Sequence, residues 1–322
     1  MDEIDKGILL ELADNCRISY QDLATQLGIT VNAIKKRFDK LVESGVICGF
    51  TIYPSLAMLE ADNLVARIYP EIQPQSDELL DLIGSNRMVR TGSYLADGSV
   101  LCFADYQGSM GLAELGKFLR GISSVKQVDL HTVICEKGSR CELTADDLRV
   151  LRELKTDARM PLSEIARNTG LTPRRVRKNL LKLFGESGSG WEIAVDEQSF
   201  GDQRTRQACM YSRVLWNLNA GGATFFIIRI FWKEDTASPH EVVAWLRKHF
   251  PLEFWYAYVS ATAPEIYTVF MVEHLRDSKP IARKVGHQPF TESIEPIFGY
   301  PSKRFKNIRD YFLEEKFATL DK

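Results

Sequence analysis

The feature that most constrains the fold is a repeat within the chain. Shifting the sequence by 142 positions aligns residues 5–41 with residues 147–183 without a gap, and eleven aligned positions are identical. The identical pairs include Arg17 with Arg159, Gly28 with Gly170 and Thr30 with Thr172. Self-similarity at a fixed period means that one structural unit occurs more than once. Whatever residues 5–41 fold into is therefore expected again at residues 147–183.

The pattern within each copy predicts three helices. In the first copy, apolar residues recur at helical spacing over residues 4–12, Ser19 can cap a short second helix, and Gly28 can end it in a left-handed turn. Thr30 can then cap a third helix, whose apolar residues share one face. The run VICGFTIY at residues 46–53 suits a short strand pair. Two short helices joined by a glycine turn, followed by such strands, indicate a winged helix-turn-helix.

The third helix of each copy carries the residues expected to contact DNA. Projection at about 100° per residue places the polar side chains opposite the apolar face. The set predicted in the first copy is Thr30, Asn32, Lys35, Lys36, Arg37 and Lys40. The set predicted in the second copy is Thr172, Arg174, Arg175, Arg177, Lys178 and Lys182. Asn32, Lys36, Arg174 and Lys178 are assigned to base edges, and the flanking cations to phosphates. The alternative is a helix whose charged side chains face only water. The occurrence of two copies in the same register argues against this alternative.

After each helix-turn-helix the pattern changes to alternating strands and helices. Residues 63–136 predict the order strand, helix, strand, strand, helix, strand, and residues 222–298 repeat it. This βαββαβ order is that of a ferredoxin-like sandwich. The fold class is therefore α+β, with two winged helix-turn-helix domains alternating with two ferredoxin-like domains. The predicted boundaries are 1–60, 61–140, 141–200 and 201–322, and a closing helix near 305–317 is expected to pack on the last module.

Composition limits the partners that the chain can have. The net charge is −2, so contact with a polyanion must come from local basic patches. No apolar stretch is long enough to cross a bilayer, and the acidic N-terminus is unlike a signal peptide, so a cytoplasmic protein that does not bind membranes is expected. The six cysteines show no zinc-ligand spacing, although Cys135 and Cys141 are close enough to pair as a redox switch. The Gly-Ser run at 185–190 is either a wing tip or a hinge.

Residues 2–53 resemble the DNA-binding part of the Lrp/AsnC (feast/famine) transcription regulators over its full length. The resemblance implies a ligand-sensing domain after each helix-turn-helix, here in two fused copies, with double-stranded DNA and a small-molecule effector such as an amino acid as partners. The family's Thr-Gly-x-Tyr-Asp stretch is matched at residues 91–94, but Leu95 replaces the acidic residue. The implied effector residues are Gly92, Tyr94, Asp97 and Gly98. A homodimer without cofactors is expected.

An enzyme is the alternative function. Siroheme decarboxylases resemble the same regulators in fold, but their His-Cys-Tyr-x-Arg type stretch has no match here. Isolated histidines are more often structural than acids or bases, and those of this chain are dispersed: His131, His240, His249, His274 and His287. The aromatic residues at 254–258 are expected in a core or at a dimer face rather than on a base-stacking platform. The sequence therefore predicts a regulator and no catalytic or metal-binding residue.

Overall fold

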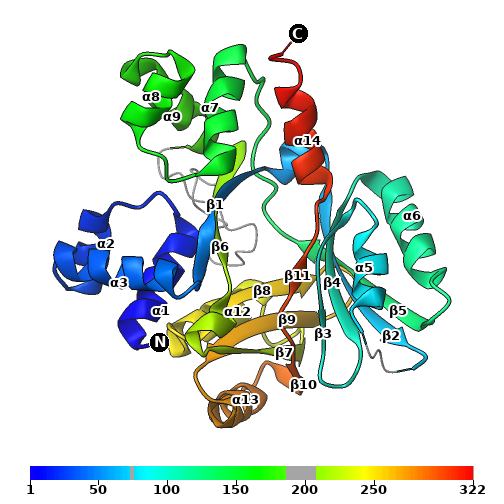
Figure 1. Cartoon of the computed structure of the whole chain (residues 1–322). Helices are drawn as coiled ribbons and strands as arrows, with labels where there is room; N and C mark the ends of the chain where they lie inside the picture. The colour runs from blue at the N-terminus through cyan, green and yellow to red at the C-terminus, as the bar shows by residue number, and fades with distance from the viewer. Residues whose placement is uncertain (73–75, 186–207, 322) are drawn as a thin grey trace.

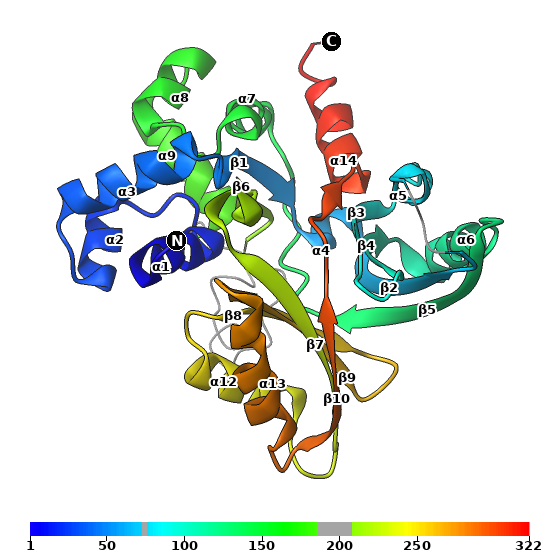
Figure 2. The same cartoon turned by 60° about the horizontal axis from the view of Figure 1, so that its bottom comes forward.

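Two groups of three helices lie on the same side of one large β-sheet (Figures 1 and 2). The computed structural model describes residues 1–72, 76–185 and 208–321. The run at 185–190 and the residues after it, which were predicted as a wing tip or a hinge, lie almost wholly outside these ranges, as does the boundary expected at residue 200. Within the described residues, no helix is both long and apolar enough to cross a membrane.

The first helical group has the predicted helices. They are α1 (Glu3–Asp14), α2 (Tyr20–Leu27) and α3 (Val31–Glu43). Ser19 and Thr30 cap α2 and α3 by accepting hydrogen bonds from backbone N–H groups in the first turn. Gly28 ends α2 with φ 65°, a conformation that a residue with a Cβ avoids. The predicted helix-turn-helix is therefore confirmed in the first copy.

The second group repeats this arrangement. Its helices are α7 (Ala145–Thr156), α8 (Leu162–Thr169) and α9 (Pro173–Phe184). Thr172 caps α9 as Thr30 caps α3, and Gly170 ends α8 with φ 69°. Pro173 occupies the first turn of α9, where a missing N–H costs no helical hydrogen bond. The prediction that the second copy folds like the first is confirmed.

Two arginines bind the helical groups to each other with repeat-related contacts. Arg17 donates to the carbonyl oxygens of Ala158 and Met160, and Arg159 donates to those of Cys16 and Ile18. These partners are related by the same shift of 142 positions that relates the two arginines. The contact therefore has local pseudo-two-fold symmetry, and it fixes the two groups relative to each other.

The strand after the first group pairs differently from the prediction. Residues 46–53 were expected to form a strand pair of their own, but they form a single strand, β1 (Ile47–Pro54). Its antiparallel partner is β6 (Met210–Trp216), from the second half of the chain. A strand of this length has no internal turn, so its backbone groups can be satisfied only by another segment. We call this two-stranded element the β1–β6 ribbon.

Both ferredoxin-like modules are present with the predicted order of elements. The first consists of β2 (Asp62–Pro70), α5 (Glu78–Gly84), β3 (Val89–Tyr94), β4 (Val100–Tyr106), α6 (Gly108–Arg120) and β5 (Val125–Ile134). The second consists of β7 (Thr224–Trp232), α12 (Pro239–His249), β8 (Phe254–Ser260), β9 (Glu265–Val272), α13 (Ser278–Gly286) and β10 (Thr291–Phe298). Short helical turns lie at α4 (Leu56–Leu59), η1 (Leu218–Gly221) and η2 (Leu275–Asp277).

The two modules form a single sheet that closes on itself. The strand order is β10-β7-β9-β8-β5-β2-β4-β3-β11, in which β5 and β8 join the halves and β11 (Lys303–Arg304) pairs with β3. The end of β10 also reaches β3, because the N–H of Ala96 donates to Phe298 and that of Tyr300 donates to Tyr94. Both edges of the sheet therefore meet in the segment around residues 299–304. Buried apolar side chains from both halves fill the space between the closed faces: Val65, Leu101, Phe103, Tyr258, Tyr267 and Val269.

The closing helix α14 (Ile308–Phe317) does not pack on the last module as expected. It lies against α7, α4 and β1, as both views show (Figures 1 and 2). Arg309 forms a fully buried ion pair with Asp105 of β4, and Asp310 pairs with Lys155 of α7. An ion pair removed from water is retained only where its geometry is good, and both oxygens of Asp105 accept from Arg309. The C-terminal segment therefore bridges the first ferredoxin-like module and the second helical group.

The cysteine pairing also differs from the prediction. Cys141 forms a disulfide with Cys209 and not with Cys135. The reason is that β6 begins beside the linker that precedes α7, since the N–H of Ser139 donates to the carbonyl oxygen of Ala208. The disulfide thus closes a loop that contains the whole second helical group. The aromatic residues Phe254, Trp255 and Tyr258 are buried, which confirms that they belong to a core.

Candidate nucleic-acid interface

The outer face of α3 is open to solvent and carries most of the residues predicted for the first copy. Its inner face is held by the buried side chains of Ile34, Phe38 and Leu41. Opposite them, the exposed residues are Thr30, Asn32, Lys35, Lys36 and Lys40. The ammonium group of Lys35 lies 6.0 Å from the ring centre of Tyr20 on α2. Asn32 and Lys36 are one turn apart on a solvent-facing stripe, as side chains that read base edges must be.

The outer face of α9 is more basic than that of α3. Val176, Leu183 and Phe184 are buried and anchor the helix. The exposed set is Thr172, Arg174, Arg175, Arg177, Lys178 and Lys182. Arg174 takes the position that Asn32 has in the first copy, and Lys178 takes that of Lys36. The two helices therefore share a lysine at one of these places and differ at the other, where Asn32 corresponds to Arg174.

Three of the predicted cations are bound by carboxylates of the same helical group. Arg37 lies 2.7 Å from oxygens of both Asp2 and Asp5, and its pKa is raised by hydrogen bonds, first to Asp2 and then to Asp5. In the second copy, the carboxylate partners are Asp146 for Arg175 at 3.0 Å and Asp147 for Lys182 at 2.6 Å. These cations hold the third helix against the first, so they contribute less free positive charge than their number suggests.

Sequence reasoning missed the carboxylates in these pairs, although a signal was present. Asp5 and Asp147 are an identical pair in the repeat, and each is the third residue of the first helix in a capping box. Each also holds a cation of the third helix in its own copy. The identical pair Arg17 and Arg159 was noted in the alignment, but its role in joining the two groups was not inferred.

The four predicted effector residues are not gathered in one place. Tyr94 and Gly98 line a cavity of about 560 Å³ that Tyr300 and Lys303 also line. Gly92 pairs with Lys303 of β11, and a Cβ on Gly92 would lie 3.2 Å from the side chain of Leu80. The C-terminal segment therefore covers the strand edge to which these residues belong.

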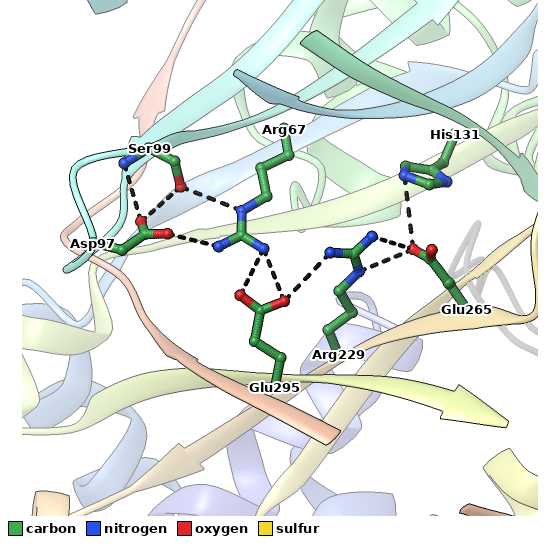
Figure 3. Close-up of polar contacts among 7 residues, drawn as sticks. All are labelled: Arg67, Asp97, Ser99, His131, Arg229, Glu265 and Glu295. Atoms are coloured by element: carbon green, nitrogen blue, oxygen red, sulfur yellow. Dashed lines mark hydrogen bonds and ion pairs between the residues drawn. The ribbon is translucent and has the colours of Figure 1, made fainter. Parts of the chain in front are cut away.

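Asp97 belongs to a chain of ion pairs that crosses from one module to the other (Figure 3). It accepts from Arg67 and from Ser99, and Arg67 also pairs with Glu295. Glu295 in turn binds Arg229, which binds Glu265, and Glu265 lies 3.7 Å from the ring of His131. Arg67 and Arg229 occupy the same position in β2 and β7. The network therefore connects repeat-related strands.

The charge states in this network follow from its geometry. Burial raises the pKa of Asp97, but hydrogen bonds from Ser99 and Arg67 outweigh it, so the carboxyl pKa is lowered. Burial lowers the pKa of His131, and the attraction of Glu265 offsets this only in part. These shifts favour a charged Asp97 and a neutral His131. Among the described residues, no group of three or more His, Cys, Asp or Glu side chains is arranged to hold a metal ion.

Comparison with known families identifies both helical groups. A family model described as a winged helix-turn-helix DNA-binding domain matches residues 1–47, and one described as an AsnC-type helix-turn-helix domain matches residues 143–183. These matches coincide with α1–α3 and α7–α9.

Relatives of known sequence are about half as long as this chain. An uncharacterised HTH-type transcriptional regulator of Pyrococcus furiosus is 30% identical over 156 residues, which are 47% of this chain and 97% of the relative. Another, of Pyrococcus abyssi, is 28% identical over 155 residues, 47% of this chain and 98% of the relative. Among solved structures, the siroheme decarboxylase NirDL covers 100% of both chains with a TM-score of 0.54 and 14% identity. This last likeness extends over the whole fold.

Proposed function

We propose that this chain, which belongs to the Lrp/AsnC family of helix-turn-helix transcription regulators, binds specific DNA sequences and regulates transcription by doing so. The observation that carries the proposal is the pair of solvent-facing basic helices, α3 and α9, each in a helix-turn-helix that matches a DNA-binding family model. Neither stripe is covered by other described residues of the chain. No enzymatic step is needed for this function.

One chain would supply two DNA-contacting helices, α3 and α9, whereas a dimeric regulator takes one from each of two subunits. The reciprocal contacts of Arg17 and Arg159 support this, because they hold the two helical groups at a fixed separation. Since Asn32 and Arg174 occupy equivalent positions, the two half-sites would differ in sequence. We expect an asymmetric operator whose half-sites lie about one helical turn, roughly 34–36 Å, apart.

Selection of bound sequences from random DNA, followed by footprinting, tests the proposal. We expect one asymmetric motif for a complex of one chain. Replacement of Arg174 by Ala should weaken binding by about 1–3 kcal/mol and relax one base position, because it removes a base contact. The matched variant Arg177→Ala should weaken all sequences alike, because it removes a phosphate contact. A palindromic motif bound by a single chain, or no sequence preference at all, would contradict the proposal.

Four finer features are part of the same proposal. The division into four domains at residues 1–60, 61–140, 141–200 and 201–322 is retained, with a cytoplasmic location and pairing of chains into a homodimer. Modulation by a small-molecule effector is also proposed, and two cavities in the described part of the chain are large enough to receive one. Selection repeated with and without a panel of amino acids, and sedimentation of the purified chain, would test the effector and the dimer.

A second candidate function is tetrapyrrole decarboxylation. One observation favours it: the fold of the siroheme decarboxylase NirDL extends over this whole chain with a TM-score of 0.54. Addition of siroheme to the purified protein, followed by absorption spectroscopy, separates the two functions. A shifted spectrum together with release of carbon dioxide would support the enzyme, whereas an unchanged spectrum with specific DNA binding would support the regulator.

A further inference from the structure

A cavity of about 640 Å³ lies between the β1–β6 ribbon and the inner face of the closed nine-stranded sheet. Its walls come from β1, β3, β4, β6, β7, β8 and β9, and from the segment 299–304 that closes the sheet. This volume is within the usual range of small-molecule sites, about 300–1,000 Å³. The cavity is separate from the exposed faces of α3 and α9.

The walls combine flat aromatic surfaces with positive charge. Aromatic side chains that line it are Tyr53, Phe103, Trp216, Phe225, Tyr256, Tyr258 and Tyr300. Four arginines line it as well: Arg90, Arg213, Arg304 and Arg309. Among the described residues that line it there is no Asp, Glu or Lys. Such walls favour a ligand that is both flat and negatively charged.

The arginines of the cavity wall differ in the protein groups that they contact. Arg309 and Arg90 both approach one carboxylate, that of Asp105. The guanidinium of Arg304 stacks 4.9 Å from the ring centre of Tyr53 and donates no hydrogen bond to any of the described residues. Arg304 is exposed to solvent where it lines the cavity. Partial loss of water around the guanidinium lowers the pKa of Arg304, Asp310 raises it, and Arg309 lowers it. Arg304 is therefore placed to receive an anion.

We propose that this cavity binds an aromatic carboxylate, with its ring among the aromatic walls and its carboxylate paired with Arg304. An α-amino acid fits less well, because its ammonium group would need a carboxylate and no acidic residue of the described part of the chain lines the cavity. A guanidinium presents two parallel N–H donors to a carboxylate, which gives the ligand one orientation.

The position of Arg304 connects the cavity to the second helical group. The segment that carries Arg304 continues into α14, which contains Arg309. On its other side, α14 is tied to α7 by the Asp310–Lys155 pair, and the residues after it by the Asp321–Arg152 pair. A ligand that draws Arg304 inward would act on the position of α9 through α7. This coupling rests on the proposed DNA-binding function, whereas occupancy of the cavity does not.

Isothermal titration calorimetry with 1-naphthoate tests the binding. The cationic analogue 1-naphthylmethylammonium and L-leucine are the comparison ligands, and Arg304→Met is compared with Lys306→Met. Lys306 is a cation of the same segment that pairs with Glu314 and does not line the cavity. We expect the wild type and Lys306→Met to bind naphthoate equally, and Arg304→Met to bind it at least about tenfold more weakly, since a charge-assisted pair is lost. Any of three results would overturn the proposal. They are naphthoate binding by Arg304→Met as tight as by the wild type, binding of either comparison ligand tighter than that of naphthoate, or no naphthoate binding by the wild type.

The same proteins separate this inference from the proposed function. Circular dichroism confirms that each variant is folded, and gel shift with the selected DNA is measured with and without naphthoate. Naphthoate binding that depends on Arg304, in a protein that binds no DNA, would support the cavity and contradict the regulator. An effect of naphthoate on DNA affinity in the wild type but not in Arg304→Met would support both.

Discussion

Single side chains hold the two helical groups together, and Arg17 and Arg159 illustrate how. Each guanidinium donates to two backbone carbonyl oxygens of the other group, so each satisfies groups that would otherwise lose their hydrogen bonds to water. Arg159 also lies within 5.5 Å of the ring centres of Tyr20, Phe38 and Phe50. The pair therefore combines charge, hydrogen bonds and aromatic contact.

Replacement of either arginine should destabilise the protein. We expect Arg17→Met or Arg159→Met to lower the free energy of unfolding by about 2 kcal/mol, because partly buried carbonyl groups lose charged donors. The control is Arg276→Met, since that side chain is 83% exposed and a surface change should cost under about 0.5 kcal/mol. Urea unfolding measures all three, and equal stability of the Arg17 and Arg276 variants would show that the contact contributes nothing.

His131 should make the stability of the protein depend on pH. Burial lowers its pKa below the ordinary histidine value of about 6.5 in the folded chain. A folded pKa below the unfolded one contributes stability above about pH 6.5, and this stability is lost as the pH falls through the folded pKa. We therefore expect the free energy of unfolding to fall between about pH 7.5 and about pH 5.5. The fall should be smaller in His131→Gln, whereas the exposed His287→Gln should behave like the wild type.

At the scale of elements, helices, strands and caps that depend on neighbouring residues were predicted correctly. Contacts between segments distant in the sequence were not. Ser19, Gly28 and Thr30, and in the second copy Gly170 and Thr172, act within one or two turns, so these caps and helix ends could be assigned from neighbouring residues. The order of strands and helices in both modules followed from local patterns in the same way. The candidate DNA-contacting faces were predicted because helical periodicity determines which side chains point outward.

The failures all concern segments that meet across long stretches of sequence. The partner of β1 is more than 150 residues away, and β11 pairs with a strand from the first module. α14 packs where Arg309 forms its ion pair with Asp105. The sequence around either residue does not predict the other as its partner. A pattern specifies which segment forms a strand or helix, but not which of several apolar or charged surfaces will cover it.

The Cys141–Cys209 disulfide should stabilise the second helical group as an element. It closes a loop with a sequence separation of 68 residues, and a cross-link of that span is worth roughly 4 kcal/mol in the chain-entropy account. We expect the oxidised protein to unfold at higher urea concentration than the reduced protein or Cys141→Ser. The control is Cys48→Ser, which removes an exposed free thiol and should leave unfolding unchanged under both conditions. If reduction does not alter unfolding of the wild type, the cross-link has no stabilising role.

For the molecule as a whole, affinity for DNA should depend strongly on salt. The net charge of −2 provides no general attraction, so binding would depend on the local cations of α3 and α9. If about six phosphates are contacted, the slope of log K against log salt should be near −5. Lys40→Ala and Arg177→Ala should each make the slope about one unit less steep, while Arg276→Ala, outside both helical groups, should not. A complex insensitive to salt would rule out phosphate contact as the source of affinity.

The meeting of both sheet edges at β11 has a consequence for how the protein is made. When β3 leaves the ribosome, one of its edges has no partner strand. β11, which pairs with that edge, is synthesised only about 200 residues later. At roughly 5–20 residues per second, this edge waits on the order of 10–40 s for its partner, a period in which it can pair with another nascent chain. A message cut short before Lys303 would never supply that cover, so truncated products should aggregate or be degraded while the complete polypeptide persists.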